Sequence, residues 1–167
     1  QAIGSDSRIG PKFLKASLGF GGSCFQKDIL NLVYICKSLG LNQAADYWEQ
    51  VVIMNNHQRN RFAHQIVKSL HGTVAAKKIG FLGWAFKKDT NDTRESAAIY
   101  IADILIEERA YVQVFDPKVT LLQIRSDLNG LNTRSETEND KFLVNHSDPY
   151  EALNGTHAIA VITEWDE

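Results

Sequence analysis

Cys24 has the setting in this sequence that best suits a nucleophile. It follows Gly21, Gly22 and Ser23 just inside an expected helix start, where free N–H groups and the helix dipole stabilise an anion. Such a position favours the thiolate, which is the nucleophilic form of cysteine. Asp28 follows four residues later on the same helix face, where it would act as a general base or orient a water beside an acyl-thiol intermediate. The alternative is a small buried cysteine that serves packing alone.

The glycines before this cysteine are a second feature. The run Gly19-Phe20-Gly21-Gly22 lets the backbone approach a ligand closely and present its amides, which would suit a sugar or a phosphate. Residues 1–40 hold five basic and two acidic side chains, and five minus two gives +3, against −2 for the whole chain. We therefore expect an anion to bind near this end, with a flexible turn and a solvated basic face as the alternatives.

A charged loop after residue 82 is a third feature. Residues 80–83 lack the G-x-G-x-x-G pattern, and Asp116 lies further away than the acidic residue of a dinucleotide site. Phe86 could pack on a ring, and Lys87 could pair with a phosphate or a sugar hydroxyl. Open α/β sheets bind ligands at such a place, after a strand. The alternative is a solvated loop with local ion pairs.

The histidines and cysteines predict no metal site. His57, His64 and His71 are spaced by seven residues, which favours a solvent or interface stripe over a metal pair at i, i+4. Cys24 and Cys36 lack zinc-ligand spacing, and Cys36 lies in an apolar run that is typical of packing.

Composition narrows the class of protein. The chain has 167 residues, of which 44% are apolar and 23% charged, which excludes a disordered, collagen-like or disulfide-scaffold chain. The net charge of −2 provides no general field for nucleic acid or an anionic membrane. The apolar stretches of the chain are too short to span a bilayer, and no signal peptide is visible in the sequence. Two cysteines suggest a reducing compartment, so we expect a cytoplasmic protein.

Two helices should position the cysteine. Ser23 and Gln26 have the spacing of a capping box, and the apolar periodicity that follows predicts a helix ending at Gly40. A second helix is predicted from about residue 42 to 70, which is about 43 Å long and should serve as a connector or an oligomer interface. Its polar run, residues 55–60, should meet water or a partner.

The rest of the chain predicts an α/β fold with a Rossmann-like parallel sheet. Strands are expected at 78–82, 111–115, 142–145 and 157–162, and helices at 95–109 and from 148 to 155. Residues 118–140 should form a loop with a short helix near 121–126.

Four segments carry a resemblance that covers essentially the whole chain. These are residues 20–28 (FGGSCFQKD), 83–96 (GWAFKKDTNDTRES), 8–17 (RIGPKFLKAS) and 163–166 (TEWD). They are similar to the UDP-glucose/GDP-mannose dehydrogenase family. The Gly-Gly-Ser-Cys core is shared across that family, whereas the Phe-Gln-Lys-Asp continuation resembles its UDP-glucose branch.

The resemblance implies a division of the chain into two parts. Residues 1–72 would be a central helical dimerisation region that carries the cysteine loop, and residues 73–167 a Rossmann-like domain for a UDP-sugar. The family also has an N-terminal NAD-binding domain with a catalytic Lys, Glu and Asn, which have no counterpart here. The chain begins at Gln1 without Met, and we expect a piece of a longer protein that ends before the family's C-terminus.

The resemblance also implies roles for individual residues. In the family, NAD-dependent oxidation of UDP-glucose to UDP-glucuronate proceeds through a thiohemiacetal and a thioester, with Cys24 matching the nucleophile and Asp28 the acid near the hydrolytic water. The substrate-binding positions matched are Arg8, which reaches a neighbouring subunit's site, then Lys15, Ala16, Ser17, Leu18, Gly19, Phe20, Gly21, Phe86 and Lys87. The cofactor-binding positions matched are Cys24, Phe25, Gln26, Lys27 and Arg94.

Three alternatives remain open at this stage. The chain could be an inactive UDP-sugar-binding and oligomerisation fragment, or a relative of the GDP-mannose type. A thiol redox sensor that uses Cys24 is the third and weakest.

Overall fold

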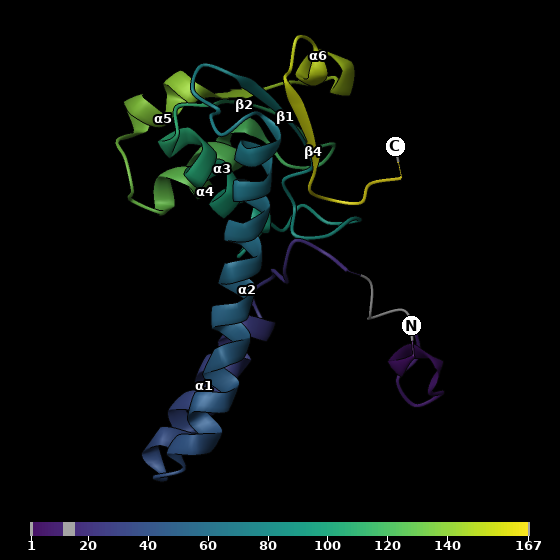
Figure 1. Cartoon of the computed structure of the whole chain (residues 1–167), viewed down its shortest axis with the longest axis vertical. Coiled ribbons are helices and arrows are strands. Elements are labelled where there is room, and N and C mark those ends of the chain that lie inside the picture. Colours follow the sequence, from purple (N-terminus) through teal and green to yellow (C-terminus); the bar gives the residue numbers. More distant parts are fainter. Residues whose placement is uncertain (1, 12–15, 167) are drawn as a thin grey trace.

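The computed structural model describes residues 2–11 and 16–166, which form a projecting helical hairpin and an α/β unit (Figure 1). The hairpin consists of α1 (Phe25–Ser38) and α2 (Asn42–Ser69). A short 3-10 turn, η1 (Ile3–Ser5), precedes it in the chain. The two predicted helices are therefore confirmed, including the unusual length of the second.

A four-stranded parallel sheet forms the centre of the α/β unit. Its strands are β1 (Lys78–Leu82), β2 (Tyr111–Phe115), β3 (Leu143–Asn145) and β4 (Ala158–Val161), in the order β3-β2-β1-β4. The flanking helices are α3 (Ala97–Glu107), α4 (Leu121–Gly130), α5 (Glu136–Phe142) and α6 (Pro149–Leu153). In the register, Ile79 of β1 lies between Val112 of β2 and Ala158 of β4. The predicted α/β class and parallel Rossmann-like sheet are confirmed.

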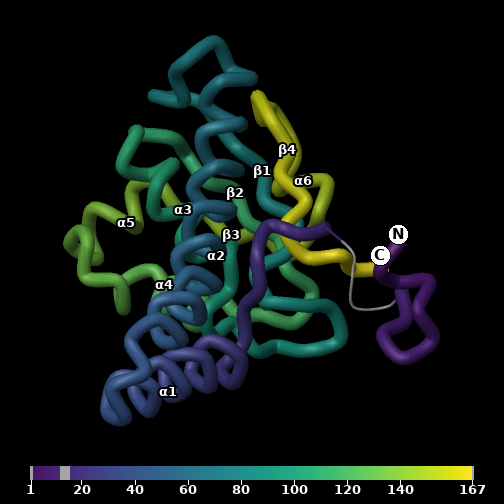
Figure 2. Tube along the Cα trace, turned by 60° about the horizontal axis from the view of Figure 1, so that its bottom comes forward, coloured from purple at the N-terminus to yellow at the C-terminus, as the bar shows by residue number. Residues whose placement is uncertain are grey.

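The long helix α2 belongs to two cores. Its C-terminal half buries Ala63 and Ile66 in the main core with the sheet and α3. Its N-terminal half packs on α1 in a small separate core around Val33 and Ala45. Both views show α1 and the first half of α2 extending away from the sheet (Figures 1 and 2). The helix thus connects the cysteine loop rigidly to the α/β unit.

Two local predictions were wrong. The capping box fails because α1 begins at Phe25 with Cys24 as its N-cap and no side-chain cap bond, while the Ser23 hydroxyl lies 3.6 Å from the Cys24 sulfur. The segment expected to be a loop with one short helix, residues 118–140, instead contains α4 and most of α5, which ends at Phe142. Ser135 caps α5, because its hydroxyl accepts from the Glu138 N–H. This capping serine is a local signal for a helix, but the charged composition of the segment favoured a loop.

None of the helices in the described parts of the chain has both the length and the apolar character needed to cross a membrane.

Candidate active site

The thiol of Cys24 lies at the very start of α1. Its side chain is exposed, and its backbone carbonyl accepts from the Asp28 N–H at 2.8 Å. Asp28 is exposed one turn further along α1. Cys36, by contrast, is buried in the core between α1 and α2, which confirms a packing role.

The loop that follows β1 packs directly against the glycines before Cys24. The Gly22 N–H donates to the Arg94 carbonyl at 2.8 Å. A Cβ on Gly21 would lie 2.6 Å from the Glu95 carbonyl oxygen and 2.8 Å from the Phe86 Cβ. The structure therefore brings together the two segments that carried most of the resemblance, although they are far apart in sequence.

Asp116, at the end of β2, fixes the root of that loop. Its carboxylate accepts from the N–H groups of Trp84 at 2.7 Å and Ala85 at 3.0 Å. It also accepts from Lys118, Val119 and the Trp165 ring N–H. With five donors on one carboxylate, Asp116 is an anchor for backbone rather than the ribose acceptor of a dinucleotide site.

Charged side chains of this loop are divided between local ion pairs and open positions. Lys88 pairs with Asp166 at 2.8 Å, which raises the pKa of Lys88. Arg94 pairs with Asp92 at 2.7 Å, and its hydrogen bonds lower the pKa of Asp92. Lys87 is exposed and forms no ion pair within the described residues, and its ammonium lies 5.5 Å from the centre of the half-buried Phe86 ring. Phe86 and Lys87 thus remain open to a ligand.

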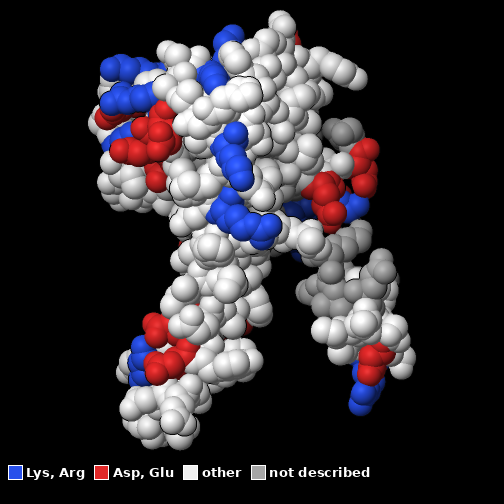
Figure 3. All heavy atoms as spheres, in the orientation of Figure 1, with Lys and Arg blue, Asp and Glu red and all other residues white. Residues whose placement is uncertain are grey.

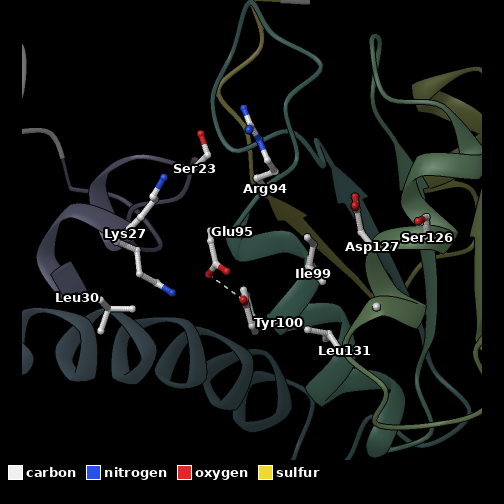
Figure 4. Close-up of a pocket in the computed structure, with 12 residues that line it drawn as sticks. Ser23, Lys27, Leu30, Arg94, Glu95, Ile99, Tyr100, Ser126, Asp127 and Leu131 are labelled. Atoms are coloured by element: carbon white, nitrogen blue, oxygen red, sulfur yellow. Dashed lines mark hydrogen bonds between the residues drawn. The ribbon is translucent and has the colours of Figure 1, made fainter. Parts of the chain in front are cut away.

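An open cleft of 620 Å³ lies between the start of α1 and the α3–α4 face (Figure 4). This volume is in the range of small-molecule sites. Three of the five residues matched to cofactor contacts line it, namely Gln26, Lys27 and Arg94. Glu95, Tyr100 and Asp127 also line it, whereas Cys24 and Phe25 are not among its lining residues.

The segment before Cys24 is bound from α2. Asn55 and Arg59 hydrogen-bond to the backbone of Phe20 and are 5% and 1% exposed. The prediction that the polar run 55–60 meets water or a partner is thus wrong for these two residues. The sequence contained a signal for the burial of Asn55, because Asn55 falls among the periodic core positions of the helix predicted over residues 42–70. Lys15, one of the matched substrate residues, lies outside the described residues.

Two further predicted features lie apart from the cysteine loop. Arg8 is 87% exposed and pairs with Asp6 in the N-terminal segment, which lies apart from the α1–α2 hairpin and the sheet (Figures 1 and 2). His57 and His64 line a shallow groove on α2 together with Arg61 and Lys68. No cluster of three or more metal-ligating side chains occurs within residues 2–11 and 16–166.

Comparisons with known proteins agree with this geometry. Residues 1–57 match the central domain of the UDP-glucose/GDP-mannose dehydrogenase family, and residues 80–167 match its UDP binding domain. The chain is 54% identical to the UDP-glucose 6-dehydrogenase of Mus musculus over 165 residues, 99% of this chain and 34% of the relative. It is also 54% identical to that of Drosophila melanogaster over 168 residues, 100% of this chain and 35% of the relative.

Solved structures show the same arrangement. A UDP-glucose dehydrogenase from the archaeon Pyrobaculum islandicum matches with a TM-score of 0.79 and 34% identity, over 98% of this chain and 34% of that one. A GDP-mannose dehydrogenase from Pseudomonas aeruginosa matches with a TM-score of 0.69 and 20% identity, over 96% and 35%, and so shares the fold. The chain spans about a third of the length of these relatives. By its two domain matches and its sequence identity, the chain belongs to the UDP-glucose/GDP-mannose dehydrogenase family.

Proposed function

We propose that this chain forms the thiol-bearing and nucleotide-sugar-binding part of an NAD-dependent dehydrogenase that oxidises UDP-glucose to UDP-glucuronate. One observation carries the proposal. The exposed Cys24 thiol stands at a helix start, and the glycines before it pack on the loop that carries Phe86 and Arg94. The 54% identity to UDP-glucose 6-dehydrogenases supports this substrate over GDP-mannose.

Cys24 would hold the sugar covalently between two oxidations. The C6 alcohol first loses a hydride and a proton to become an aldehyde. The thiol then adds to that carbon, so that a C–S bond forms and the thiol proton passes to the carbonyl oxygen. Loss of a second hydride, together with the hydroxyl proton, leaves a thioester. Water then breaks the C–S bond, which releases the carboxylate and returns the thiol.

Asp28 is suited to the hydrolytic step. Its carboxylate lies one turn from Cys24 and is open to solvent. A carboxylate there can accept a proton from the attacking water and so promote thioester hydrolysis. The Asp28 side chain is exposed and forms no ion pair or side-chain hydrogen bond with the described residues, so water can reach it.

The residues present suit a dinucleotide at the cleft. Lys27 and Arg94 supply two cationic side chains for its phosphates, and the buried Gln26 Oε1 has no hydrogen-bond partner and could accept a donor from the ligand. NAD, when bound, accepts the hydride in each oxidation. Phe86 and Lys87 then remain for the sugar nucleotide, with Lys87 suited to a phosphate or a sugar hydroxyl.

The α1–α2 hairpin would join copies of the protein. Large apolar side chains on it are well exposed, among them Tyr34 at 71%, Tyr47 at 70% and Met54 at 63%. An apolar surface of this kind marks an interface. We extend the same proposal to the two-part division at residue 72, to Arg8 reaching a neighbouring subunit's site, and to a cytoplasmic location that keeps the thiol reduced.

Replacement of Cys24 tests the chemistry. In the full-length protein, Cys24→Ser should abolish the formation of UDP-glucuronate from UDP-glucose and the second of the two NADH molecules, because a serine hydroxyl forms no thioester. The matched control is Cys36→Ser, which changes a buried packing residue and should leave turnover measurable. Normal NADH production by Cys24→Ser would refute the nucleophile assignment.

Calorimetry tests which ligands this chain binds by itself. The 167-residue chain should bind UDP and UDP-glucose, because Phe86, Lys87 and the Gly19–Gly22 segment all lie within it. It should bind NAD weakly, because the cleft offers only one wall of a dinucleotide site. Tight NAD binding by this chain would contradict that expectation.

A further inference from the structure

Asn55 of α2 binds the backbone of one residue in the loop before the thiol. Its Oδ1 accepts from the Phe20 N–H at 2.8 Å, and its Nδ2 donates to the Phe20 carbonyl at 3.0 Å. Two bonds to one residue fix both its position and its direction. Asn55 is only 5% exposed, so water does not compete readily for either bond.

Arg59, one turn further along α2, reaches two separate segments. Its Nη2 donates to the Phe20 carbonyl at 3.0 Å and to the Glu95 carbonyl at 2.8 Å. Phe20 precedes Cys24, whereas Glu95 ends the loop that begins after β1. One buried guanidinium therefore ties the cysteine loop to the loop of Phe86 and Lys87.

Arg59 places a guanidinium group in an almost completely buried position. A buried charge is costly unless it is paired and hydrogen-bonded. Here the Glu95 carboxylate lies 3.6 Å from Nη1, and the guanidinium carbon lies 4.3 Å from the centre of the Tyr100 ring. The Tyr100 hydroxyl in turn donates to Glu95 at 2.8 Å. In this arrangement Nη2 is directed at the two carbonyls, while the buried Nε has no hydrogen-bond partner among the described residues.

Two glycines show how closely these parts fit. A Cβ on Gly19 would lie 2.5 Å from the Asn55 Oδ1, and a Cβ on Gly21 would lie 2.6 Å from the Glu95 carbonyl oxygen. Both distances are below those that real Cβ atoms adopt. The loop before Cys24 is thus packed between α2 on one side and the loop after β1 on the other.

We propose that Asn55 and Arg59 are positioning residues that set Cys24 against the sugar-binding residues Phe86 and Lys87. They act through the backbone of Phe20 and Glu95 and contact no reacting atom. The consequence for catalysis rests on the proposed function, because the thiol must meet the aldehyde before the aldehyde departs. If the loop shifts, the first oxidation continues while capture by the thiol becomes slower.

The test uses two conservative variants of the full-length protein. Arg59→Lys keeps the charge, but the lysine side chain is shorter, so its ammonium does not reach the position from which Nη2 donates to both carbonyls. Asn55→Asp keeps the acceptor for the Phe20 N–H and loses the donor for its carbonyl. The matched control is Arg61→Lys on the same helix, where Nη1 contacts only the Gln58 side chain.

Two measurements are made on each variant. Amide hydrogen exchange of the peptide that spans residues 19–24 should quicken by about tenfold, because the loop opens more readily once the Phe20 carbonyl loses a donor from α2. Exchange in β1 should be unchanged. With UDP-glucose and NAD, the share of product trapped as free sugar aldehyde by a hydrazine probe should rise by about tenfold. Simple loss of folded protein would lower turnover without raising that share.

Each outcome decides a separate question. Wild-type exchange in both variants would show that the two residues do not hold the loop. Faster exchange with no rise in trapped aldehyde would show that the contacts of Asn55 and Arg59 with the loop do not affect how fast the thiol captures the aldehyde. If the wild-type protein oxidises no UDP-glucose, the proposed function fails, and the exchange measurement still decides whether Asn55 and Arg59 hold the loop.

Discussion

The carboxylate of Asp116 shows how a single side chain determines where this site can form. Its two oxygens accept from the backbone at the start of the loop after β1, from the turn after β2, and from the ring N–H of Trp165. Asp116 is 8% exposed. Because its acceptor capacity is used by protein donors, ligand contacts at this edge must come from the loop itself.

Replacement of Asp116 should be costly to stability. In Asp116→Asn an NH2 group replaces one of the two carboxylate oxygens. Where it replaces Oδ2, the buried N–H groups of Trp84 and Ala85 lose their acceptor. Loss of buried acceptors costs about 1–3 kcal/mol each, and we expect the free energy of unfolding to fall by about 2–4 kcal/mol in total. Urea unfolding of the chain measures it.

Asp89→Asn provides the matched control for that measurement. Asp89 is an exposed residue of the same loop with a positive φ of 64°, which asparagine also adopts readily. This variant should change the unfolding free energy by less than about 0.5 kcal/mol. Equal effects of the two substitutions would contradict the anchoring role of Asp116.

At the scale of elements, the contact between the cysteine loop and the loop after β1 depends on the absence of side chains. Gly21→Ala would place a methyl group against the Glu95 carbonyl and the Phe86 Cβ. The two segments must then separate, at a cost of about 1–3 kcal/mol. We expect lower stability in urea and slower oxidation of UDP-glucose by the full-length protein, because Cys24 moves away from Phe86.

Gly130→Ala is the contrasting change. A Cβ at Gly130 meets nothing within 4 Å, and Gly130 is the last residue of α4. Alanine is the better helix former by about 1 kcal/mol, so this variant should be as stable as wild type or slightly more stable. If Gly21→Ala behaved in the same way, the close packing of the two loops would not matter for stability.

The elements themselves were largely predictable, because their signals are local. Strands 78–82 and 111–115 have continuous apolar runs, and the Gly40 and Gly72 stops adopt positive φ values of 73° and 82°. The helix start at Cys24 could likewise be inferred from the residues around it. What the sequence could not show is the bond network of Arg59, because its partners Phe20 and Glu95 are distant in the chain.

The same distinction explains the errors. An arginine amid polar neighbours, as in residues 55–60, is typical of a solvated face. Only the tertiary fold brings two carbonyls and the Glu95 carboxylate to Arg59 and makes its burial possible. The capping box at Ser23 failed for a related reason, because the loop geometry is set by α2 and by the Arg94 carbonyl rather than by the helix start alone.

At the scale of the whole molecule, the hairpin stands away from the sheet and is sparsely charged. Apart from one group that includes acidic and basic residues, most of its visible surface is uncharged (Figure 3), and Lys37 pairs there with Glu49 at 3.1 Å. Its own core is small, with four buried residues. A second copy of the chain could cover the exposed apolar side chains and stabilise a hairpin that has so little core of its own.

Charge placed on that surface should therefore separate the copies. Tyr34→Lys together with Met54→Lys puts two charges on the apolar surface of α1 and α2, and burial of an unpaired charge in an interface is strongly unfavourable. Sedimentation over a range of concentrations should show association of the wild-type chain and a monomer for the double variant. Leu122→Lys, at a residue 79% exposed on α4, is the control and should associate as wild type does. A wild-type chain that stays monomeric at every concentration would contradict an interface on the hairpin. Equal dissociation by Leu122→Lys would show that the loss of association does not depend on the apolar surface of α1 and α2.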